Sequence, residues 1–275
     1  MHAWLSDLED LVRSAGDAVL DVYHSEFAVT TKEDRTPLTL ADQRSHAILV
    51  EGLRRIDPTI PVLSEEGAEI PYEERKHWTR FWLVDPLDGT KEFIRRNGEF
   101  TINVALIENG RPVLGLVLVP DQQRLLLGDV LNGCLEKHEG FTRKVVLKEP
   151  EAAQPLVVVA TRSHPTPEME VFFRHLPPHE RLSRGSALKF CAVAAGEAHC
   201  YPRFGPTWEW DTAAGHAVVE AAGGVVVDPQ GKPLRYNKPA LINGYFLVGP
   251  SLAWMETVGI LAAARAACPI GNHQS

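Results

Sequence analysis

The stretch that most constrains this chain is WLVDPLDGT, residues 82–90. An apolar run, Phe81 to Val84, suits a short buried strand and leads directly into Asp85. The proline that follows stiffens the turn and brings Asp88 round to the same side. The next glycine lets backbone approach a ligand, and a short helix expected over Lys91 to Arg96 directs its first N–H groups forward. The stretch predicts two carboxylates beside N–H donors, which together suit a metal-assisted phosphate site.

The same stretch has a purely structural interpretation. An Asp-Pro turn followed by an aspartate N-cap is common wherever a strand leads into a helix. Residues 82–90 alone therefore favour neither interpretation over the other. The decision depends on what the rest of the chain places beside them.

Composition narrows the class of protein. The chain has 275 residues, 44% of them hydrophobic and 23% charged, which suits a globular protein with a sizeable core. Its net charge of −8 argues against a general nucleic-acid binder, and it means that a polyanionic substrate needs locally placed cations. The four cysteines are scattered without a CxxC pair, so neither a zinc site nor a disulfide framework is indicated.

The expected location is the cytoplasm. The N-terminal sequence has early acids and lacks the apolar core of a signal peptide. No apolar run approaches the roughly 18 residues of a membrane span, and scattered thiols suit a reducing compartment. A peripheral association with the inner membrane stays open, as does the oligomeric state.

Hydrophobic periodicity predicts mixed α and β structure in two joined halves, residues 1–150 and 151–275. The first half is expected to contain two amphipathic helices and an antiparallel sheet with Asn-Gly turns. The second half alternates strands and helices, with a last strand over 241–248 and one terminal helix over 251–266. Three short features are expected before the second helix: a strand over 27–31, a polar loop over 32–37 and a capping box over 39–42.

Other acidic side chains stand at strand ends and helix starts. Glu65 follows a short apolar strand, Asp42 lies in the first turn of a helix, and Asp211 opens an Ala-rich helix. Each also has a structural alternative, which is a solvated turn for Glu65 and a helix cap for the two aspartates. Considered singly, Glu65 and Asp211 favour these alternatives.

Three motifs together resemble the inositol monophosphatase superfamily, the Li⁺-sensitive, Mg²⁺-dependent phosphatases. DPLDGT at 85–90 resembles the family's DPxDGT motif, and LSEE at 63–66 resembles its upstream Glu-Glu. WDTAAG at 210–215, with EAAGG at 220–224, resembles its downstream WDxAAG…EAGG motif. The three follow the family's order and spacing over nearly the whole chain. The resemblance implies an α+β fold layered as an α-β-α-β-α sandwich.

Longer runs are similar to one branch of that superfamily. WLVDPLDGTKEFIRRNGEFTINVALI, GSALKFCAVAAGEA and YPRFGP closely resemble bacterial 3′(2′),5′-bisphosphate nucleotidases of the sulfur-assimilation type. These release the 3′-phosphate of adenosine 3′,5′-bisphosphate, which implies a small-molecule nucleotide substrate. Arg203 stands near the place where inositol monophosphatases have an acid that binds a sugar hydroxyl, and a cation there suits a second phosphate. Lys189 and Arg184 would extend this cationic wall, with surface charge as the alternative for each.

The resemblance also implies roles for individual residues. Two Mg²⁺ ions, with a third left open, would be held by Glu65, Asp85, the Leu87 carbonyl, Asp88 and Asp211. Asp42 would pair with the Thr90 hydroxyl to orient and deprotonate an attacking water. Substrate contacts would come from Glu65, Leu87, Asp88, Gly89, Thr90, Ser186, Lys189, Arg203 and Asp211.

Three alternatives stay open. The nearest is another phosphatase of the superfamily, acting on an inositol phosphate or another sugar phosphate such as fructose bisphosphate. A second is a non-catalytic metal- or nucleotide-binding protein on the same scaffold. The third is a structural α/β protein whose acids only cap helices, and such a protein would not be stabilised by Mg²⁺.

Overall fold

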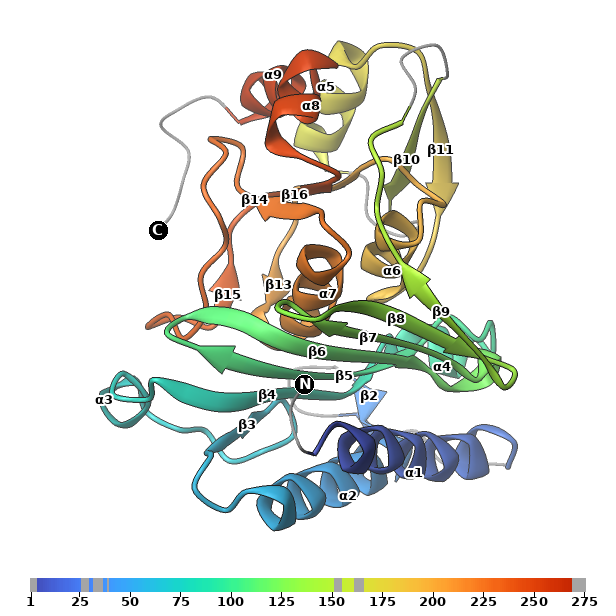
Figure 1. The fold of residues 1–275 in the computed structure, drawn as a ribbon, viewed down its shortest axis with the longest axis vertical. Coiled ribbons are helices and arrows are strands. Elements are labelled where there is room, and N and C mark those ends of the chain that lie inside the picture. Colours follow the sequence, from blue (N-terminus) through green and yellow to red (C-terminus); the bar gives the residue numbers. More distant parts are fainter. Residues whose placement is uncertain are drawn as a thin grey trace.

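The computed structural model describes residues 4–25, 30–31, 37–38, 40–150, 155–160 and 166–268. Its elements form five layers in the order α-β-α-β-α, with a pair of long helices at one end and a group of short helices at the other (Figure 1). The layered α+β sandwich implied by the sequence resemblance is therefore confirmed. No helix in the described part of the chain is both long and apolar enough to cross a lipid bilayer.

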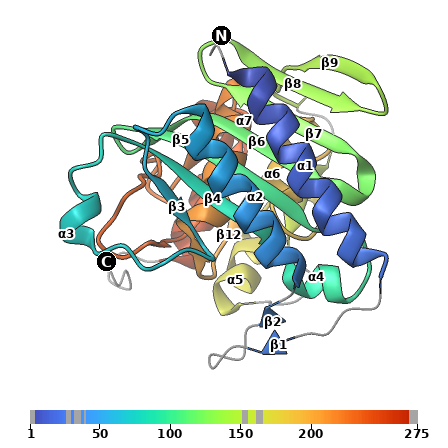
Figure 2. The same ribbon diagram turned by 90° about the horizontal axis from the view of Figure 1, so that it is seen from below.

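The first layer consists of α1 (Leu5–Tyr23) and α2 (Leu40–Ile56), which lie side by side across one face of the large sheet (Figure 2). Both carry apolar residues at helical spacing, and Leu8, Leu49 and Leu53 are fully buried against that sheet. A two-stranded antiparallel pair, β1 (Thr30–Thr31) with β2 (Pro37–Leu38), precedes α2.

The large sheet has seven strands in the order β3-β4-β5-β6-β7-β8-β9. β3 runs parallel to β4, and every later neighbour pairs antiparallel. The strands are β3 (Val62–Ser64), β4 (Arg80–Asp88), β5 (Thr101–Glu108), β6 (Arg111–Val119), β7 (Arg124–Asp129), β8 (Gly133–His138) and β9 (Phe141–Val145). Short helices interrupt this run at α3 (Tyr72–Arg75), α4 (Thr90–Ile94) and the 3₁₀ turn η1 (Pro120–Gln122).

The middle layer contains α6 (Leu188–Ala194) and α7 (Glu209–Ala221), which cover the opposite face of the large sheet (Figure 1). Two glycines on the sheet let α7 approach closely. A Cβ added at Gly115 would lie 2.3 Å from the Ala214 carbonyl oxygen, and one at Gly128 would lie 2.5 Å from the Val218 Cα. The position of α7, and hence of the side chains on its first turn, depends on this contact.

We expect Gly128→Ala to lower the free energy of unfolding by roughly 1–3 kcal/mol, because the new methyl group meets helix backbone that cannot move aside alone. Urea denaturation checks this. Gly244→Ala is the matched control, since a Cβ there meets nothing within 4 Å. Equal stability of the two variants would show that α7 does not depend on the glycine contact.

The fourth and fifth layers belong to the second half of the chain. They contain a parallel pair, β10 (Leu156–Ala160) with β11 (His179–Ser183), and a three-stranded antiparallel sheet. That sheet is ordered β12 (Tyr201–Arg203), β16 (Phe246–Gly249), β14 (Val225–Val227), and β13 (Thr207–Trp208) pairs separately with β15 (Ile242–Asn243). The last layer consists of α5 (Pro167–His175), α8 (Leu252–Thr257) and α9 (Ile260–Ala267).

Some expected elements differ in the structure. The single terminal helix was wrong, because Gly259 adopts φ +83° and separates α8 from α9. The single strand over 241–248 was also wrong, since β15 and β16 pair with different strands. β11 was not predicted, and the strand expected over 27–31 is described only at Thr30–Thr31. The polar loop at 32–36 and the cap residue Thr39 lie outside the described residues.

The division into halves at residue 150 stays a prediction. The core cluster that contains Leu83 and Val117 from the first half also contains Val193, Val218 and Phe246 from the second. The two halves therefore share this core cluster, while each also has a cluster of its own.

Candidate active site

The pairing of β3 with β4 brings Glu65 next to Asp85. The two strands run parallel with Ser64 opposite Val84, and the Glu65 N–H donates to the Val84 carbonyl at 3.1 Å. Glu65 and Asp85 are the residues that follow this last pair. Two acids twenty positions apart in the chain thus lie side by side at the same end of the β3–β4 pair.

A bulge in β4 shapes the turn that follows Asp85. Asp85 pairs with Asn103 and Asp88 with Thr101, so β4 has one residue more than β5 over this interval. The Leu87 N–H donates to Asp85 Oδ1 at 3.1 Å, and the Ser45 hydroxyl on α2 donates to the Pro86 carbonyl at 2.7 Å. These bonds fix the turn, and the bulge redirects Asp88.

The third acid comes from the second half of the chain. Asp211 lies in the first turn of α7, where its Oδ2 accepts the Trp208 N–H at 2.9 Å. Asp211 is thus a capping residue, as the structural alternative held, but it is also close to the other acids. Carboxylate oxygens of Glu65, Asp85 and Asp211 all lie within 4.8 Å of one another. The structure therefore brings three predicted ligands together from distant parts of the sequence.

These acids repel one another in a buried place. Asp85 is 1% exposed, and its Oδ2 has no hydrogen-bond partner among the described residues. Burial raises the pKa of Asp85 well above its usual value, and the charges of Glu65, Asp88, Asp211 and Asp42 raise it further. Burial and Asp88 likewise raise the pKa of Asp211. A set of crowded carboxylate oxygens with an unused buried acceptor fits a hard divalent cation.

Asp88 borders this cluster and is held by Ser186. The Ser186 hydroxyl donates to Asp88 Oδ2 at 2.6 Å and lies 2.6 Å from the Thr101 hydroxyl. Ser186 adopts φ +50°, which is uncommon for a residue other than glycine. Ser186 thus joins the loop before α6 to the end of β4. Its contact with substrate stays a prediction.

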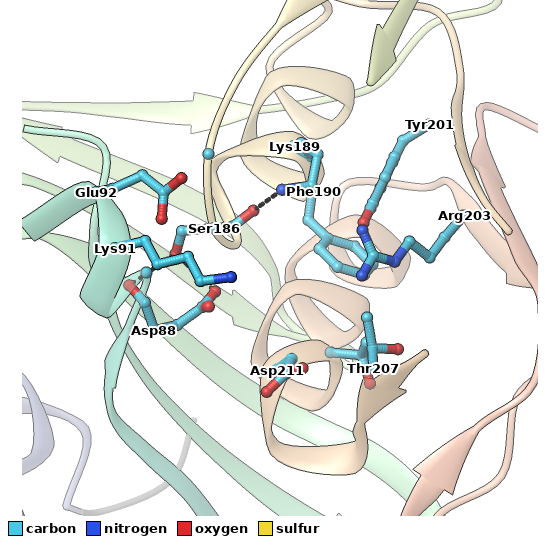
Figure 3. Close-up of a pocket in the computed structure, with 13 residues that line it drawn as sticks. Asp88, Lys91, Glu92, Ser186, Lys189, Phe190, Tyr201, Arg203, Thr207 and Asp211 are labelled. Atoms are coloured by element: carbon cyan, nitrogen blue, oxygen red, sulfur yellow. Dashed lines mark hydrogen bonds between the residues drawn. The ribbon is translucent and has the colours of Figure 1, made fainter. Parts of the chain in front are cut away.

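A cavity of about 260 Å³ opens beside Asp88 and Asp211. Figure 3 shows these two acids at one side of it, with Lys189, Tyr201 and Arg203 at the other. Gly89, Lys91 and Ser186 also line it, whereas Arg184 is not among its described lining residues. Of the predicted cationic wall, Lys189 and Arg203 line this cavity and Arg184 does not, while Lys91, which was not predicted as part of it, adds a third cation.

Two of these cations are held in place by backbone carbonyls. Lys189 is 6% exposed and donates to the Ser186 carbonyl at 2.6 Å, and burial lowers its pKa to about 8. The Arg203 guanidinium donates to the Gly205 and Pro206 carbonyls at 3.2 and 2.8 Å. Both donors also face the cavity, where an anionic group would satisfy them better than water does.

The predicted water-activating pair lies at the same end of the sheet. Asp42, on α2, is 5% exposed, and its charge contributes to the raised pKa of Asp85. The Thr90 hydroxyl, at the start of α4, donates to the Leu87 carbonyl at 3.4 Å. The pairing of Asp42 with Thr90 stays a prediction.

Sequence reasoning missed Asn103 and Ser45. Asn103 pairs with Asp85 across β4 and β5, is 1% exposed, and neither its side-chain nitrogen nor its side-chain oxygen has a partner in the described part of the chain. An asparagine within the apolar run TINVALI was the available signal, because strand interiors rarely contain one. Ser45 had no such signal, since a serine on a helix is ordinarily exposed.

Known proteins share this sequence and fold. The 3′(2′),5′-bisphosphate nucleotidase CysQ of Shigella flexneri is 48% identical over 247 residues, covering 89% of this chain and 98% of that protein. The crystal structure of CysQ from Bacteroides thetaiotaomicron matches with a TM-score of 0.78 at 39% identity, covering 89% of this chain and 96% of that one. The crystal structure of the extragenic suppressor protein suhB of Bartonella henselae shares the fold, with a TM-score of 0.78 at 22% identity. The match covers 98% of this chain and 99% of the suhB chain.

The family model described as the inositol monophosphatase family matches residues 2–267. That range includes all three sequence motifs and the carboxylates that the fold gathers. The chain belongs to the inositol monophosphatase family.

Proposed function

We propose that this protein is a Mg²⁺-dependent 3′(2′),5′-bisphosphate nucleotidase that converts adenosine 3′,5′-bisphosphate to AMP and phosphate. One observation supports it most strongly: the cavity with Lys91, Lys189 and Arg203 directly adjoins the carboxylate cluster. A bisphosphate substrate needs two phosphate-binding sites. The reacting phosphate must lie beside the metal ligands, and the other phosphate needs a site lined by cations. The relatives named as 3′(2′),5′-bisphosphate nucleotidases support the same assignment.

The proposed metal ligands are Glu65, Asp85, the Leu87 carbonyl, Asp88 and Asp211. Two Mg²⁺ ions suit this set, because four carboxylates partly balance their four positive charges and Mg²⁺ prefers oxygen ligands. When bound, such ions lower the pKa of a coordinated water and neutralise charge on the phosphoryl and leaving oxygens. The binding of a third ion stays an open question.

The remaining roles belong to the chain itself. Asp42 accepts a proton from the attacking water and Thr90 orients it, while the N–H groups at Gly89 and Thr90 face the reacting phosphate. Lys189 and Arg203 hold the second phosphate, which positions the nucleotide for reaction. No side-chain nucleophile is required, so phosphate formed in H₂¹⁸O should contain one solvent oxygen and show inversion at phosphorus. Retention would indicate a phosphoenzyme and contradict direct attack by water.

An inositol monophosphatase is the alternative within the family. Arg203 favours the nucleotidase, because a guanidinium recognises phosphate well and a sugar hydroxyl poorly. The proposed substrate is thus a small nucleotide bisphosphate, and the proposed location is the cytoplasm.

The test is phosphate release from three substrates at equal concentration: adenosine 3′,5′-bisphosphate, inositol 1-phosphate and fructose 1,6-bisphosphate. We expect Mg²⁺-dependent release chiefly from the first, with inhibition by Li⁺ in the millimolar range. EDTA-treated protein is the control. Preference for inositol 1-phosphate would favour the alternative, and no release from any of the three would favour a non-catalytic binding protein.

A further inference from the structure

A buried carboxylate stands two positions before the proposed ligand Asp211. Glu209, the first residue of α7, is fully buried. Its carboxylate accepts the Asn237 N–H at 2.6 Å, the Lys238 N–H at 3.0 Å and the Lys238 ammonium at 2.6 Å. Glu209 therefore fastens the start of α7 to the loop that follows β14.

The same loop is held from the other side by the first half of the chain. Arg75, at the end of α3, is 3% exposed. Its guanidinium donates to the side-chain oxygen of Asn237 at 3.0 Å, the Lys238 carbonyl at 2.6 Å and the Pro239 carbonyl at 2.7 Å. The Asn237 amide in turn donates to the Arg75 carbonyl at 2.6 Å. Residues 237–239 are thus fixed between α3 and α7.

Further bonds tie the first turn of α7 to β15, the strand that follows this loop. The Asn243 amide, on β15, donates to the Trp208 carbonyl at 2.9 Å and to the Thr212 hydroxyl at 3.0 Å. The Lys238 ammonium also donates to Asn243 Oδ1 at 3.0 Å. Trp208 and Glu209 before Asp211 and Thr212 after it are therefore anchored, which restricts where the Asp211 carboxylate can lie.

The acid cluster needs such an anchor. Glu65 and Asp85 come from the first half of the chain and Asp211 from the second, yet their oxygens lie within 4.8 Å. When these carboxylates are ionised they repel one another across the junction of the two halves, so packing and hydrogen bonds must oppose that repulsion. The links from Arg75 through residues 237–239 to Glu209 span this junction.

We infer that the Arg75–Glu209 clamp, defined as these two side chains with residues 237–239 between them, holds Asp211 against Glu65 and Asp85 and thereby sets the affinity for divalent metal. Glu209 and Arg75 are positioning residues, since neither is a proposed ligand. The inference rests on the proposed metal site and adds a determinant of its affinity.

The test measures metal binding without substrate. Mn²⁺ is titrated into EDTA-treated, dialysed protein and free Mn²⁺ is followed by electron paramagnetic resonance. Loss of a group that bonds a metal ligand directly weakens binding by about 10–100-fold. Glu209 acts one step further away, through the start of α7, so we expect Glu209→Gln to raise the Kd for Mn²⁺ by about tenfold, the lower end of that range. Excess Mg²⁺ should then restore turnover toward the wild-type value, because the ligands themselves are unchanged.

Glu220→Gln is the matched control. Glu220 lies on the same helix, and its carboxylate pairs with Arg111 and His216 at 3.2 Å. We expect this variant to lose stability without a change in the Kd for Mn²⁺. Because Arg75 and Glu209 act through one loop, Arg75→Met combined with Glu209→Gln should raise the Kd by less than the product of the two single effects.

Two outcomes would overturn the clamp: an unchanged Kd in folded Glu209→Gln, or an equal rise in Glu220→Gln. Should Glu209→Gln fail to fold, Lys238→Met removes the ammonium bonds to Glu209, Asn243 and the Arg235 carbonyl but keeps the Glu209 carboxylate, and it must then raise the Kd. The proposed activity is tested separately. Wild-type protein that binds Mn²⁺ but hydrolyses no bisphosphate would contradict the proposed function. The Mn²⁺ titrations of the variants would still support or overturn the clamp.

Discussion

Asp85→Asn is expected to reduce kcat by on the order of 10³-fold or more, beyond the 10–100-fold that partners outside the ligand set contribute. Asp85 is the most buried of the clustered acids and has an unused acceptor oxygen among the described residues. Asparagine keeps its shape and its bond from the Leu87 N–H but removes the charge that a divalent cation requires. Phosphate release from adenosine 3′,5′-bisphosphate at saturating Mg²⁺ measures the effect.

The same substitution should leave the metal-free protein no less stable. The pKa of Asp85 is raised on folding, so the protonated form is the one that the folded state prefers. Its contribution to stability therefore falls as pH rises from the unfolded value of 3.8 through the higher folded pKa. Neutral pH lies above the unfolded value, so the wild-type protein has lost stability there through this group, whereas the neutral asparagine loses none. We expect the Tm in EDTA to rise or stay equal, and its increase on adding Mg²⁺ to disappear.

Asp129→Asn is the control for this prediction. Asp129 is also buried, at 3% exposure, and its carboxylate accepts bonds from Leu131 and Asn132 in a turn of the large sheet. That variant should lose stability and keep both activity and the Mg²⁺-dependent rise in Tm. If Asp85→Asn kept wild-type turnover, Asp85 would not be a metal ligand.

Lys189→Met is expected to lower kcat/KM for adenosine 3′,5′-bisphosphate by about 10²-fold, because removing one partner of a buried charge pair costs about 2–5 kcal/mol. Adenosine 3′-monophosphate lacks the second phosphate, so its kcat/KM should change much less. The ratio of the two losses is the measurement. Lys137→Met, which removes a lysine paired with Glu9 away from the cavity, is the control. Equal losses on both substrates would remove Lys189 from recognition of the second phosphate.

A pH profile sharpens this prediction. Burial lowers the pKa of Lys189 to about 8, so the side chain is cationic below that pH and neutral above it. The preference of the wild-type protein for bisphosphate over monophosphate should therefore decline above about pH 8. Arginine stays charged throughout this range, so Lys189→Arg should move the decline to higher pH. A preference that is independent of pH in the wild-type protein would contradict the role of Lys189.

Local chemistry was predictable wherever a short motif determines it. The strand that carries Asp85, the irregular turn to Asp88 and the helix carrying Asp211 all follow from neighbouring residues. The closeness of Glu65 to Asp85 depends on the parallel pairing of β3 with β4, which no local pattern contains. That closeness was expected only through the family resemblance.

Contacts between distant polar side chains were not predictable. Ser186 was expected as a substrate contact, yet its hydroxyl donates to Asp88. Glu209 lies between two tryptophans and gave no sign of its bonds to residues 237 and 238. The break at Gly259 was missed because a glycine within an apolar helical pattern is often tolerated. Each of these depends on which segments the whole fold brings together.

The origin of the acid cluster from both halves of the chain has a consequence for biosynthesis. Glu65 and Asp85 leave the ribosome long before Asp211, and α7 must dock on the large sheet before the three carboxylates meet. Under the proposed metal site, a nascent chain that ends ahead of α7 lacks one of the proposed ligands and is not yet stabilised by magnesium. Metal binding would then stabilise only the nearly finished polypeptide in which α7 has docked correctly.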